Sequence, residues 1–187
     1  MASDSVTIEG AFRGRKFLFK SKAGVFSKEK VDQGSRLLIE KMEIQPDDFI
    51  LDLGCGYGPI GIVAATLANK GRVILIDSDL RAIHLSEENL VLNKVENAQV
   101  LLSDGWEATG SHHFSVILSN PPASSGIDIF QEFAEGAFAH LRPEGKLYFV
   151  TQSRLKEAVK RIFEKVFGNF KIVDRDSKYT VSLAVKK

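Results

Sequence analysis

Two short stretches of the chain combine residue types that could act on a ligand. Residues 50–61, Ile-Leu-Asp-Leu-Gly-Cys-Gly-Tyr-Gly-Pro-Ile-Gly, lead from an apolar run through Asp52 into a glycine-rich turn. Glycines let the backbone turn tightly and approach a ligand with no Cβ in the way. Residues 119–122, Ser-Asn-Pro-Pro, follow a second apolar run, and the two prolines fix φ and remove two backbone donors. With the Asn120 amide beside it, this stiff turn would hold an exocyclic amino group and direct its lone pair at an electrophile.

The glycine-rich turn fits two cofactor patterns at once. Residues 52–58 read Asp-x-Gly-x-Gly-x-Gly, as in enzymes that bind S-adenosylmethionine (SAM), and residues 56–61 read Gly-x-Gly-x-x-Gly, as in dinucleotide enzymes. Asp52 could accept from a cationic group, which in SAM is the methionine ammonium. Cys55 is most simply a small residue that fits the turn.

Acidic residues after two further predicted strands favour a nucleoside ligand. Asp77 lies about twenty residues beyond the loop, where a carboxylate can accept from both ribose hydroxyls. Asp104, in the run Ser-Asp-Gly-Trp, could accept from an adenine amino group, with Trp106 against the ring. Dehydrogenases also place an acid at the position of Asp77, but a nicotinamide oxidoreductase would give Asp104 and Asn120 no task.

The elements that must position these groups alternate along the chain. We predict strands at residues 49–53, 72–77, 99–102, 114–119 and 146–151, and helices at 59–69, 80–93, 129–141 and 155–167. Apolar strands that alternate with amphipathic helices indicate an α/β fold with a parallel sheet covered on both faces. Two successive strands, at 170–173 and 179–185, complete seven strands and imply an antiparallel C-terminal member.

The first 45 residues differ from the rest and are predicted to form a basic β-hairpin and helix extension on a domain of residues 46–187. Phe12, Phe17 and Phe19 alternate with basic residues around a turn near Arg13 and Arg15, and a helix-like run follows at 31–42. Eight basic and two acidic residues between positions 11 and 36 give this segment a charge of +6, in a chain of net charge +1. The segment is either a solvated arm or a patch for nucleic-acid phosphates, with aromatic rings that could stack on bases.

Composition excludes several other classes of protein. The 187 residues, 44% of them hydrophobic, contain one cysteine, which excludes an internal disulfide and a multi-cysteine metal cluster. The four histidines form no convincing catalytic or metal site. No segment resembles a signal peptide or reaches membrane-spanning length. We therefore expect a soluble, cytoplasmic protein with no membrane partner and no metal.

The glycine loop together with Asn-Pro-Pro resembles the class I SAM-dependent methyltransferases that modify amino nitrogens. Residues 24–38, Gly-Val-Phe-Ser-Lys-Glu-Lys-Val-Asp-Gln-Gly-Ser-Arg-Leu-Leu, resemble the Gly-Val-Phe-Ser…Asp-x-Gly-Ser-x-Leu-Leu segment of the methyltransferase small-domain family. That family includes RsmC-type enzymes, which methylate a guanine amino nitrogen in small-subunit ribosomal RNA. The resemblance runs from about Phe17 to the C-terminus. It implies a Rossmann-like SAM methyltransferase fold, SAM as the cofactor, and ribosomal RNA or a ribosomal subunit as the partner.

The resemblance also implies roles for individual residues. SAM would be held by Asp52, Gly54, Cys55, Gly56, Gly58, Asp77, Ser78, Ser103, Asp104 and Asn120. The target amine would be gripped by Asn120, Pro121 and Pro122. Phe26 and Ser27, with Asp32 and Gly34, would form a lid or wall near the transferred methyl group. The residues expected to bind the substrate are Phe26, Ser27, Lys30, Asp32, Arg13 and Arg15, of which Arg13, Arg15 and Lys30 are assigned by the charge of the basic segment.

Two departures from the family pattern leave the substrate open. Residue 123 is Ala, where many amino methyltransferases carry an aromatic residue that stacks on the base, so that Phe26 becomes the candidate for stacking. RsmC-type enzymes also carry an additional N-terminal domain, without which RNA docking would fall to residues 13–30 or to a partner. The alternatives are a methyltransferase for another amine (adenine, a protein glutamine amide or a small molecule), and a non-catalytic RNA-binding module.

Overall fold

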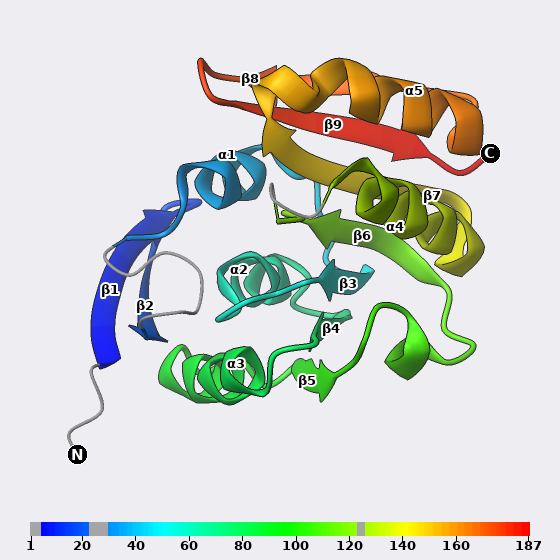
Figure 1. The fold of residues 1–187 in the computed structure, drawn as a ribbon. Coiled ribbons are helices and arrows are strands. Elements are labelled where there is room, and N and C mark those ends of the chain that lie inside the picture. The colour runs from blue at the N-terminus through cyan, green and yellow to red at the C-terminus, as the bar shows by residue number, and fades with distance from the viewer. Residues whose placement is uncertain (1–4, 23–29, 123–125) are drawn as a thin grey trace.

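The computed structural model describes residues 5–22, 30–122 and 126–187, which form an α/β fold around a seven-stranded sheet (Figure 1). The strands lie in the order β5-β4-β3-β6-β7-β9-β8. Their bounds are β3 Phe49–Leu53, β4 Arg72–Asp77, β5 Ala98–Leu102, β6 Phe114–Ser119, β7 Leu141–Gln152, β8 Lys171–Arg175 and β9 Tyr179–Val185. Strand β9 runs antiparallel to both of its neighbours, and the pairs from β5 to β7 are parallel. The predicted fold class is confirmed.

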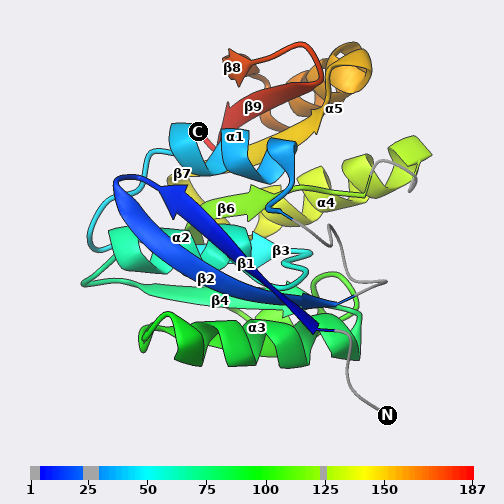
Figure 2. The ribbon, with the colours of Figure 1, turned by 90° about the vertical axis from the view of Figure 1, so that its left-hand side faces the viewer.

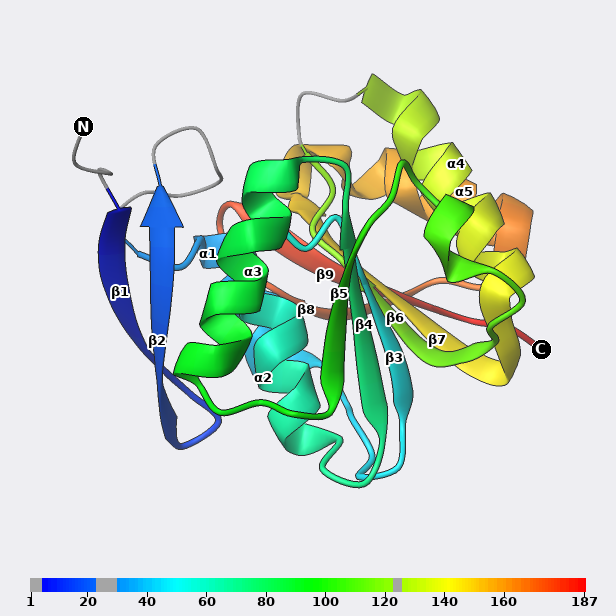
Figure 3. The same ribbon diagram turned by 90° about the horizontal axis from the view of Figure 1, so that it is seen from below.

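Helices cover both faces of this sheet, as Figure 3 shows from below. One face carries α1 (Gln33–Lys41), α2 (Pro59–Leu67) and α3 (Leu80–Leu92), and the other carries α4 (Gly126–His140) and α5 (Lys156–Phe167). Short 3₁₀ helices occur at Glu107–Thr109 and Ser153–Leu155. None of the helices in the described part of the chain is both long and apolar enough to cross a membrane.

The largest boundary difference from the sequence prediction is at β7. This strand begins at Leu141 rather than near residue 146, because Leu141 already pairs with Phe114 of β6. The register then shifts before Lys146 pairs with Val116, and Glu144 adopts a φ of 62°. Residues 142–145, which lie between the predicted helix and the predicted strand, are therefore an irregular part of β7.

The N-terminal hairpin consists of β1 (Ser5–Phe12) and β2 (Arg15–Lys22), which pair along their whole length. Figure 2 shows it lying against the side of the molecule that carries α2 and α3. Asn89 of α3 and Asn93, the C-cap of that helix, fasten it: Asn89 Oδ1 accepts from the Lys20 N–H at 2.6 Å, and Asn93 Oδ1 accepts from the Leu18 N–H at 3.0 Å. Their amide nitrogens donate back to the carbonyls of the same two residues. The two asparagine side chains thus bond to the backbone N–H and C=O groups of β2 as a neighbouring strand would.

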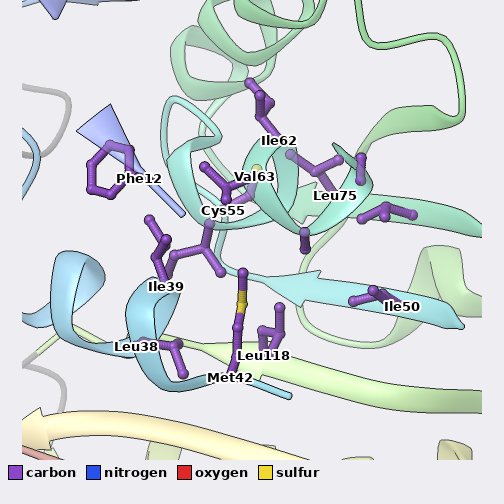
Figure 4. Packing of buried hydrophobic residues seen from close by; sticks show 14 of the residues in the cluster. Phe12, Leu38, Ile39, Met42, Ile50, Cys55, Ile62, Val63, Leu75 and Leu118 are labelled. Carbon is purple, nitrogen blue, oxygen red and sulfur yellow. The ribbon is translucent and has the colours of Figure 1, made fainter. Parts of the chain in front are cut away.

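The aromatic rings of the hairpin belong to the hydrophobic core. Phe12, Phe17 and Phe19 are at most 4% exposed. Phe12 packs in the same cluster as Ile39 of α1 and Val63 of α2 (Figure 4). The expectation that these rings stack on RNA bases is therefore wrong: period-2 alternation puts the aromatic side chains on the buried face of the hairpin and most of the cations on the other. The division into residues 1–45 and 46–187 stays a prediction.

Candidate functional site

A cavity of about 740 Å³ opens at the carboxyl ends of β3, β4, β5 and β6. Cofactor sites of open α/β sheets lie at this end of the strands, and their volumes are typically about 300–1,000 Å³. The predicted residues that line it are Gly54, Cys55, Gly56, Asp77, Ser78, Ser103, Asp104, Asn120 and Pro122. The predicted residues Phe26 and Ser27, with Ala123, lie outside the described residues. Most of the residues expected to hold the cofactor are thus brought to one cavity.

The glycine-rich loop leaves open space at two of its positions. Gly54 and Gly56 have φ values of 72° and 58°, and a Cβ at either position would meet nothing within 4 Å. Gly58 has a φ of 91° and precedes Pro59 at the start of α2. Left-handed backbone at three alternate positions explains the three glycines, because other residues are strained there. The open space in front of two of them is a cradle that a ligand could fill.

Asp52 does not line the cavity. Its side chain is fully buried, and its Oδ2 accepts from the Gly61 N–H at 2.7 Å. Burial raises the pKa of this carboxyl to about 7, and none of the described residues pairs with Oδ1. The expectation that Asp52 directly meets a ligand cation is thereby corrected, because the carboxylate holds the first turn of α2. A Cβ on Gly61 would lie 2.6 Å from Leu75 Cγ, so that Gly61 is a packing glycine between α2 and β4.

Asp77 joins the glycine loop to the end of β4. One carboxylate oxygen accepts from the Gly56 N–H at 2.8 Å and the other from the Asp79 N–H at 2.9 Å. Asp79 in turn caps α3 by accepting from the Arg81 N–H. Each carboxylate oxygen can accept more than one bond, so Asp77 can still take ribose hydroxyls in the cavity that it lines.

The turn after β5 places Asp104 and Trp106 at the cavity. Ser103 fixes this turn, because its Oγ donates to the Gly105 carbonyl and accepts from the Ala108 N–H, both at 3.0 Å. The Trp106 ring stacks on His140 of α4 at a centroid distance of 5.0 Å. One face of the indole is therefore already covered.

The Asn120 side chain is tied to α1. Its Nδ2 donates to Asp32 Oδ2 at 3.0 Å and to Ser35 Oγ at 2.9 Å. Asp32 is the N-cap of α1, and its Oδ1 accepts from the Tyr179 hydroxyl at 3.3 Å. Asp32 therefore contacts Asn120 and does not itself line the cavity, whereas Ser35 lines it.

Several residues that line the cavity were not predicted from the sequence. Ile129, Glu132 and Phe133 of α4 line the cavity, at the i, i+3 and i+4 spacing of one helix face, and Ser35 and Tyr57 line it as well. Phe133 also packs against the hydrophobic core, and the periodicity of a helix alone cannot separate the two roles. The Tyr57 hydroxyl is buried with no hydrogen-bond partner among residues 5–22, 30–122 and 126–187, and burial raises the pKa of this phenol.

The basic residues of the hairpin have different surroundings. Arg13 donates to the carbonyls of Glu40 at 3.0 Å and Met42 at 2.7 Å, where it satisfies the C-terminal end of α1. Arg13 is exposed and has further N–H donors, so its part in RNA binding stays a prediction. Arg15 lines a second hollow of about 380 Å³, together with Lys16 and Lys94. Lys30 is exposed at the start of the segment that leads to α1.

The titratable groups give no sign of other chemistry. Burial raises the pKa of the Cys55 thiol well above its usual range, and its Sγ lies 3.7 Å from the Ser86 hydroxyl. A buried thiol of this kind is a poor nucleophile. No three His, Cys, Asp or Glu side chains gather as metal ligands within the described residues.

In a comparison with known proteins, the chain matches one family. The family described as methyltransferase small domain matches residues 16–183. The uncharacterized protein YbxB of Bacillus subtilis is 35% identical over 98% of this chain and 93% of its own length. Ribosomal RNA small subunit methyltransferase C of Vibrio cholerae is 32% identical over 94% of this chain and 51% of its own length, and ribosomal RNA large subunit methyltransferase G of Streptomyces avermitilis is 30% identical over 88% and 44%.

Among solved structures, the Thermus thermophilus 16S ribosomal RNA N2 G1207 methyltransferase, RsmC, in complex with AdoMet and guanosine, superimposes with a TM-score of 0.90. It is 30% identical and covers the whole of this chain, which matches 52% of the RsmC chain. The chain thus spans about half the length of the named methyltransferases that it matches.

Proposed function

The chain belongs to the methyltransferase small-domain family, and from this premise we propose that it transfers a methyl group from SAM to the exocyclic amino group of a guanine in ribosomal RNA. The observation that carries the proposal is the Asn120 side chain at the cavity. Its NH₂ is occupied by Asp32 and Ser35, so its carbonyl oxygen remains to accept from an amine. Two of the relatives are named as ribosomal RNA methyltransferases, and RsmC of T. thermophilus is a guanine N2 methyltransferase.

The cofactor is SAM, and the cavity fits it. The open space before Gly54 and Gly56 would receive the methionine part, and Asp77 would hold the ribose hydroxyls. Asp104 would accept from the adenine amino group. Asp52 would act from behind the loop, because its carboxylate keeps the start of α2 in place while the loop bounds the cavity.

The reaction requires positioning more than a strong base. When bound, SAM supplies a sulfonium methyl group, to which the amine lone pair forms a bond as the S–C bond electrons move to sulfur and the nitrogen releases a proton to water. The lone pair of an exocyclic amine is delocalised into the ring, so the nitrogen is a weak nucleophile. Asn120 accepts a hydrogen of the amine and thereby turns the lone pair toward the methyl group, and it stabilises the positive charge that grows on nitrogen. Pro121 and Pro122 stiffen the turn that carries it.

The RNA would approach over the hairpin side of the molecule. Arg15, Lys16 and Lys94 around the second hollow supply cations for phosphates, and Lys30 adds another near α1. The buried phenylalanines leave this surface with charge and no free rings among the hairpin residues described. We therefore propose electrostatic docking by the hairpin and base recognition in the cavity.

One experiment tests the proposal directly. The protein is incubated with SAM labelled in the methyl group and with total RNA or isolated ribosomal subunits, and the digested RNA is analysed for modified nucleosides. We expect label in N2-methylguanosine. Label in methyladenosine or in a protein glutamine would contradict the guanine assignment and would support the alternative amines. Label nowhere, from a protein that binds SAM, would support a non-catalytic module.

A second measurement tests the docking surface. If phosphates dominate RNA binding, the logarithm of the association constant falls linearly with the logarithm of the salt concentration. Replacing Arg15 and Lys16 together by Ala should reduce that slope by about two, roughly one per lost phosphate contact. A KM for substrate that does not change with salt would favour a small uncharged substrate instead.

A further inference from the structure

The structure also assigns a task to α1, and we propose that Asp32, with Ser35, is a positioning residue for the methyl transfer. Asp32 fixes the Asn120 amide with its carbonyl oxygen toward the target amine. This inference rests on the proposed function, because it takes Asn120 as the acceptor for that amine. The inference gives a role in the reaction to α1, a helix that precedes the cofactor-binding loop in the chain.

An asparagine side chain must be held in one orientation, because the oxygen and NH₂ ends of its amide have nearly the same shape but opposite hydrogen-bonding character. The carbonyl oxygen accepts, whereas the NH₂ group donates. If the amide were turned around, a donor would face the hydrogens of the amine and the lone pair would not be directed. The site therefore requires a neighbour that permits only one orientation.

Asp32 is a neighbour of that kind. Its Oδ2 lies 3.0 Å from Asn120 Nδ2, and an ionised carboxylate has no hydrogen to donate, so a reversed amide would bring two acceptors together. Ser35 Oγ accepts from the same nitrogen at 2.9 Å. The two amide hydrogens are thus both used within the protein, and the carbonyl oxygen is the atom left for a ligand.

The Asp32 carboxylate is itself held at both oxygens. Oδ2 also accepts from the Ser35 N–H at 3.0 Å, as the N-cap of α1, and Oδ1 accepts from the Tyr179 hydroxyl at 3.3 Å. Asp32 and Asn120 are 88 positions apart in the chain, and Asp32 and Tyr179 are 147 apart. The arrangement joins the start of α1, the end of β6 and the start of β9.

Gly34 allows the tyrosine to reach the carboxylate. A Cβ at this position would lie 2.8 Å from Tyr179 Cδ1 and 3.0 Å from Asp32 Oδ2, both shorter than ordinary contacts. The Asp-x-Gly-Ser spacing thus has a physical reason. Asp32 orients the amide, Gly34 admits the ring, and Ser35 takes the second amide hydrogen.

The same arrangement strengthens the acceptor. A negative charge on the donor side of an amide polarises it and increases the electron density at its oxygen, because hydrogen bonds in series reinforce one another. The amine becomes more positive as it is methylated, so the stronger acceptor favours the transition state over the bound substrate. Loss of Asp32 should therefore lower kcat more than it raises KM.

Asp32→Asn is the informative variant. Asparagine is also a good N-cap, so α1 should remain stable, but its own NH₂ can donate to a reversed Asn120 amide. We expect kcat to fall by about 30-fold, with the SAM Kd and the RNA KM within about threefold of the wild type. Ser35→Ala, which removes one of the two acceptors, should lower kcat by about fivefold.

Gln33→Ala is the matched control. Gln33 lies in the same turn of α1 and donates to Asp176 at 2.8 Å, and among the described residues it makes no hydrogen bond with Asn120. The activity of Gln33→Ala should stay within about twofold of the wild type, because this variant removes only a contact that docks α1. An equal loss of kcat in Gln33→Ala and Asp32→Asn would overturn the positioning role.

A double-mutant cycle gives a second criterion. Once Asn120 is replaced by Ala, the amide that Asp32 orients is gone, and Asp32→Asn should cause no further loss of residual activity. Losses that multiply would show that Asp32 acts independently of Asn120 and would overturn the proposal.

Nitrogen-15 NMR of the ligand-free protein separates this inference from the proposed function. The Asn120 side-chain NH₂ signals, assigned by their absence in Asn120→Ala, should be protected from exchange in the wild type and should lose protection and shift in Asp32→Asn. Unchanged signals would overturn the proposal. If the wild type methylates no ribosomal RNA, the proposed function fails, and the NMR comparison still decides whether Asp32 holds the amide.

Discussion

At the glycine loop the polar contacts join segments that are close in the chain, whereas at Asn120 they join segments that are far apart. Asp52 reaches Gly61 across 9 positions, and Asp77 reaches Gly56 across 21. The Asn120 contacts span 85 and 88 positions. The cofactor side of the cavity is thus built within neighbouring strand–helix units, and the amine side exists only when α1, β6 and β9 have come together.

This difference predicts that cofactor binding and methyl transfer can be lost separately. Substitutions at the loop should change SAM affinity or the stability of the loop, and substitutions around Asn120 should change transfer alone. Variants that change both properties to the same extent would remove the distinction between the two sides.

Asn120→Ala should have the largest effect. Removal of the acceptor should reduce methyl transfer by about 1,000-fold, roughly 4 kcal/mol of activation free energy, since one preorganised hydrogen-bonding group typically contributes about 10²–10³. Calorimetry should give a SAM Kd within a few-fold of the wild type. A variant that still methylates ribosomal RNA normally would refute the role assigned to Asn120.

Asp52→Asn sharpens the comparison through the pH dependence of stability. The pKa of this carboxyl is about 7 in the folded protein because of burial, above its ordinary value of 3.8, so folding favours the protonated form. The wild type should therefore lose stability as pH rises from about 4 to about 7, and Asp52→Asn, which has no such proton, should gain relative to it by up to about 4 kcal/mol. Urea unfolding of both proteins at about pH 4.5 and about pH 8 measures the difference in their unfolding free energies.

Asp174→Asn is the control of opposite sign. Lys41 lowers the pKa of the Asp174 carboxyl, so this carboxylate stabilises the fold at neutral pH and loses its contribution as the pH falls below its ordinary range. Its replacement should lower stability by a similar amount at about pH 8 and about pH 4.5, and should have less effect only well below its ordinary value of 3.8, so urea unfolding at about pH 2.5 is added for this variant. If both variants followed the same pH trend, the effect at Asp52 would not come from its buried charge.

Phe19→Ala tests whether the hairpin supports the cofactor side. Phe19 is fully buried and packs edge-on against Tyr57 of the glycine loop at 6.0 Å between centroids. Its truncation should lower the unfolding free energy by about 3 kcal/mol. Leu18→Ala, at a side chain 40% exposed on the same strand, should cost less than about 1 kcal/mol. Equal, small effects would mean that the hairpin is an independent arm.

Asp77→Asn should have the smallest effect of the four. The neutral amide would weaken the bond from the Gly56 N–H and the bonds proposed to the ribose hydroxyls, and the SAM Kd should rise by about 30-fold, roughly 2 kcal/mol. RNA affinity should not change. Asp79→Asn, two residues away at the cap of α3, provides the comparison, and an equal loss of SAM affinity there would point to the helix rather than to the ribose.

The sequence by itself determined the fold class and several of the polar residues that line the cavity. Continuous apolar strands and amphipathic helices are local patterns, and strands at 49–53, 72–77 and 114–119 agree with the structure to the residue. Because the carboxyl ends of parallel strands meet at one edge, a polar residue directly after a strand can be placed there without knowing the rest of the fold. Asp77, Asp104 and Asn120 lie at the cavity for this reason.

Tertiary structure decided the surroundings of each side chain. Asp52 follows the same sequence rule yet is buried behind the loop, and the hairpin phenylalanines, which alternate with cations, turn inward. The partners of Asn120 could not be found from the chain, because hydrogen bonds across 85 to 147 positions depend on the packing of a helix and two strands. Local patterns fix which residues share an element, but only the packed sheet and helices fix which polar atoms meet.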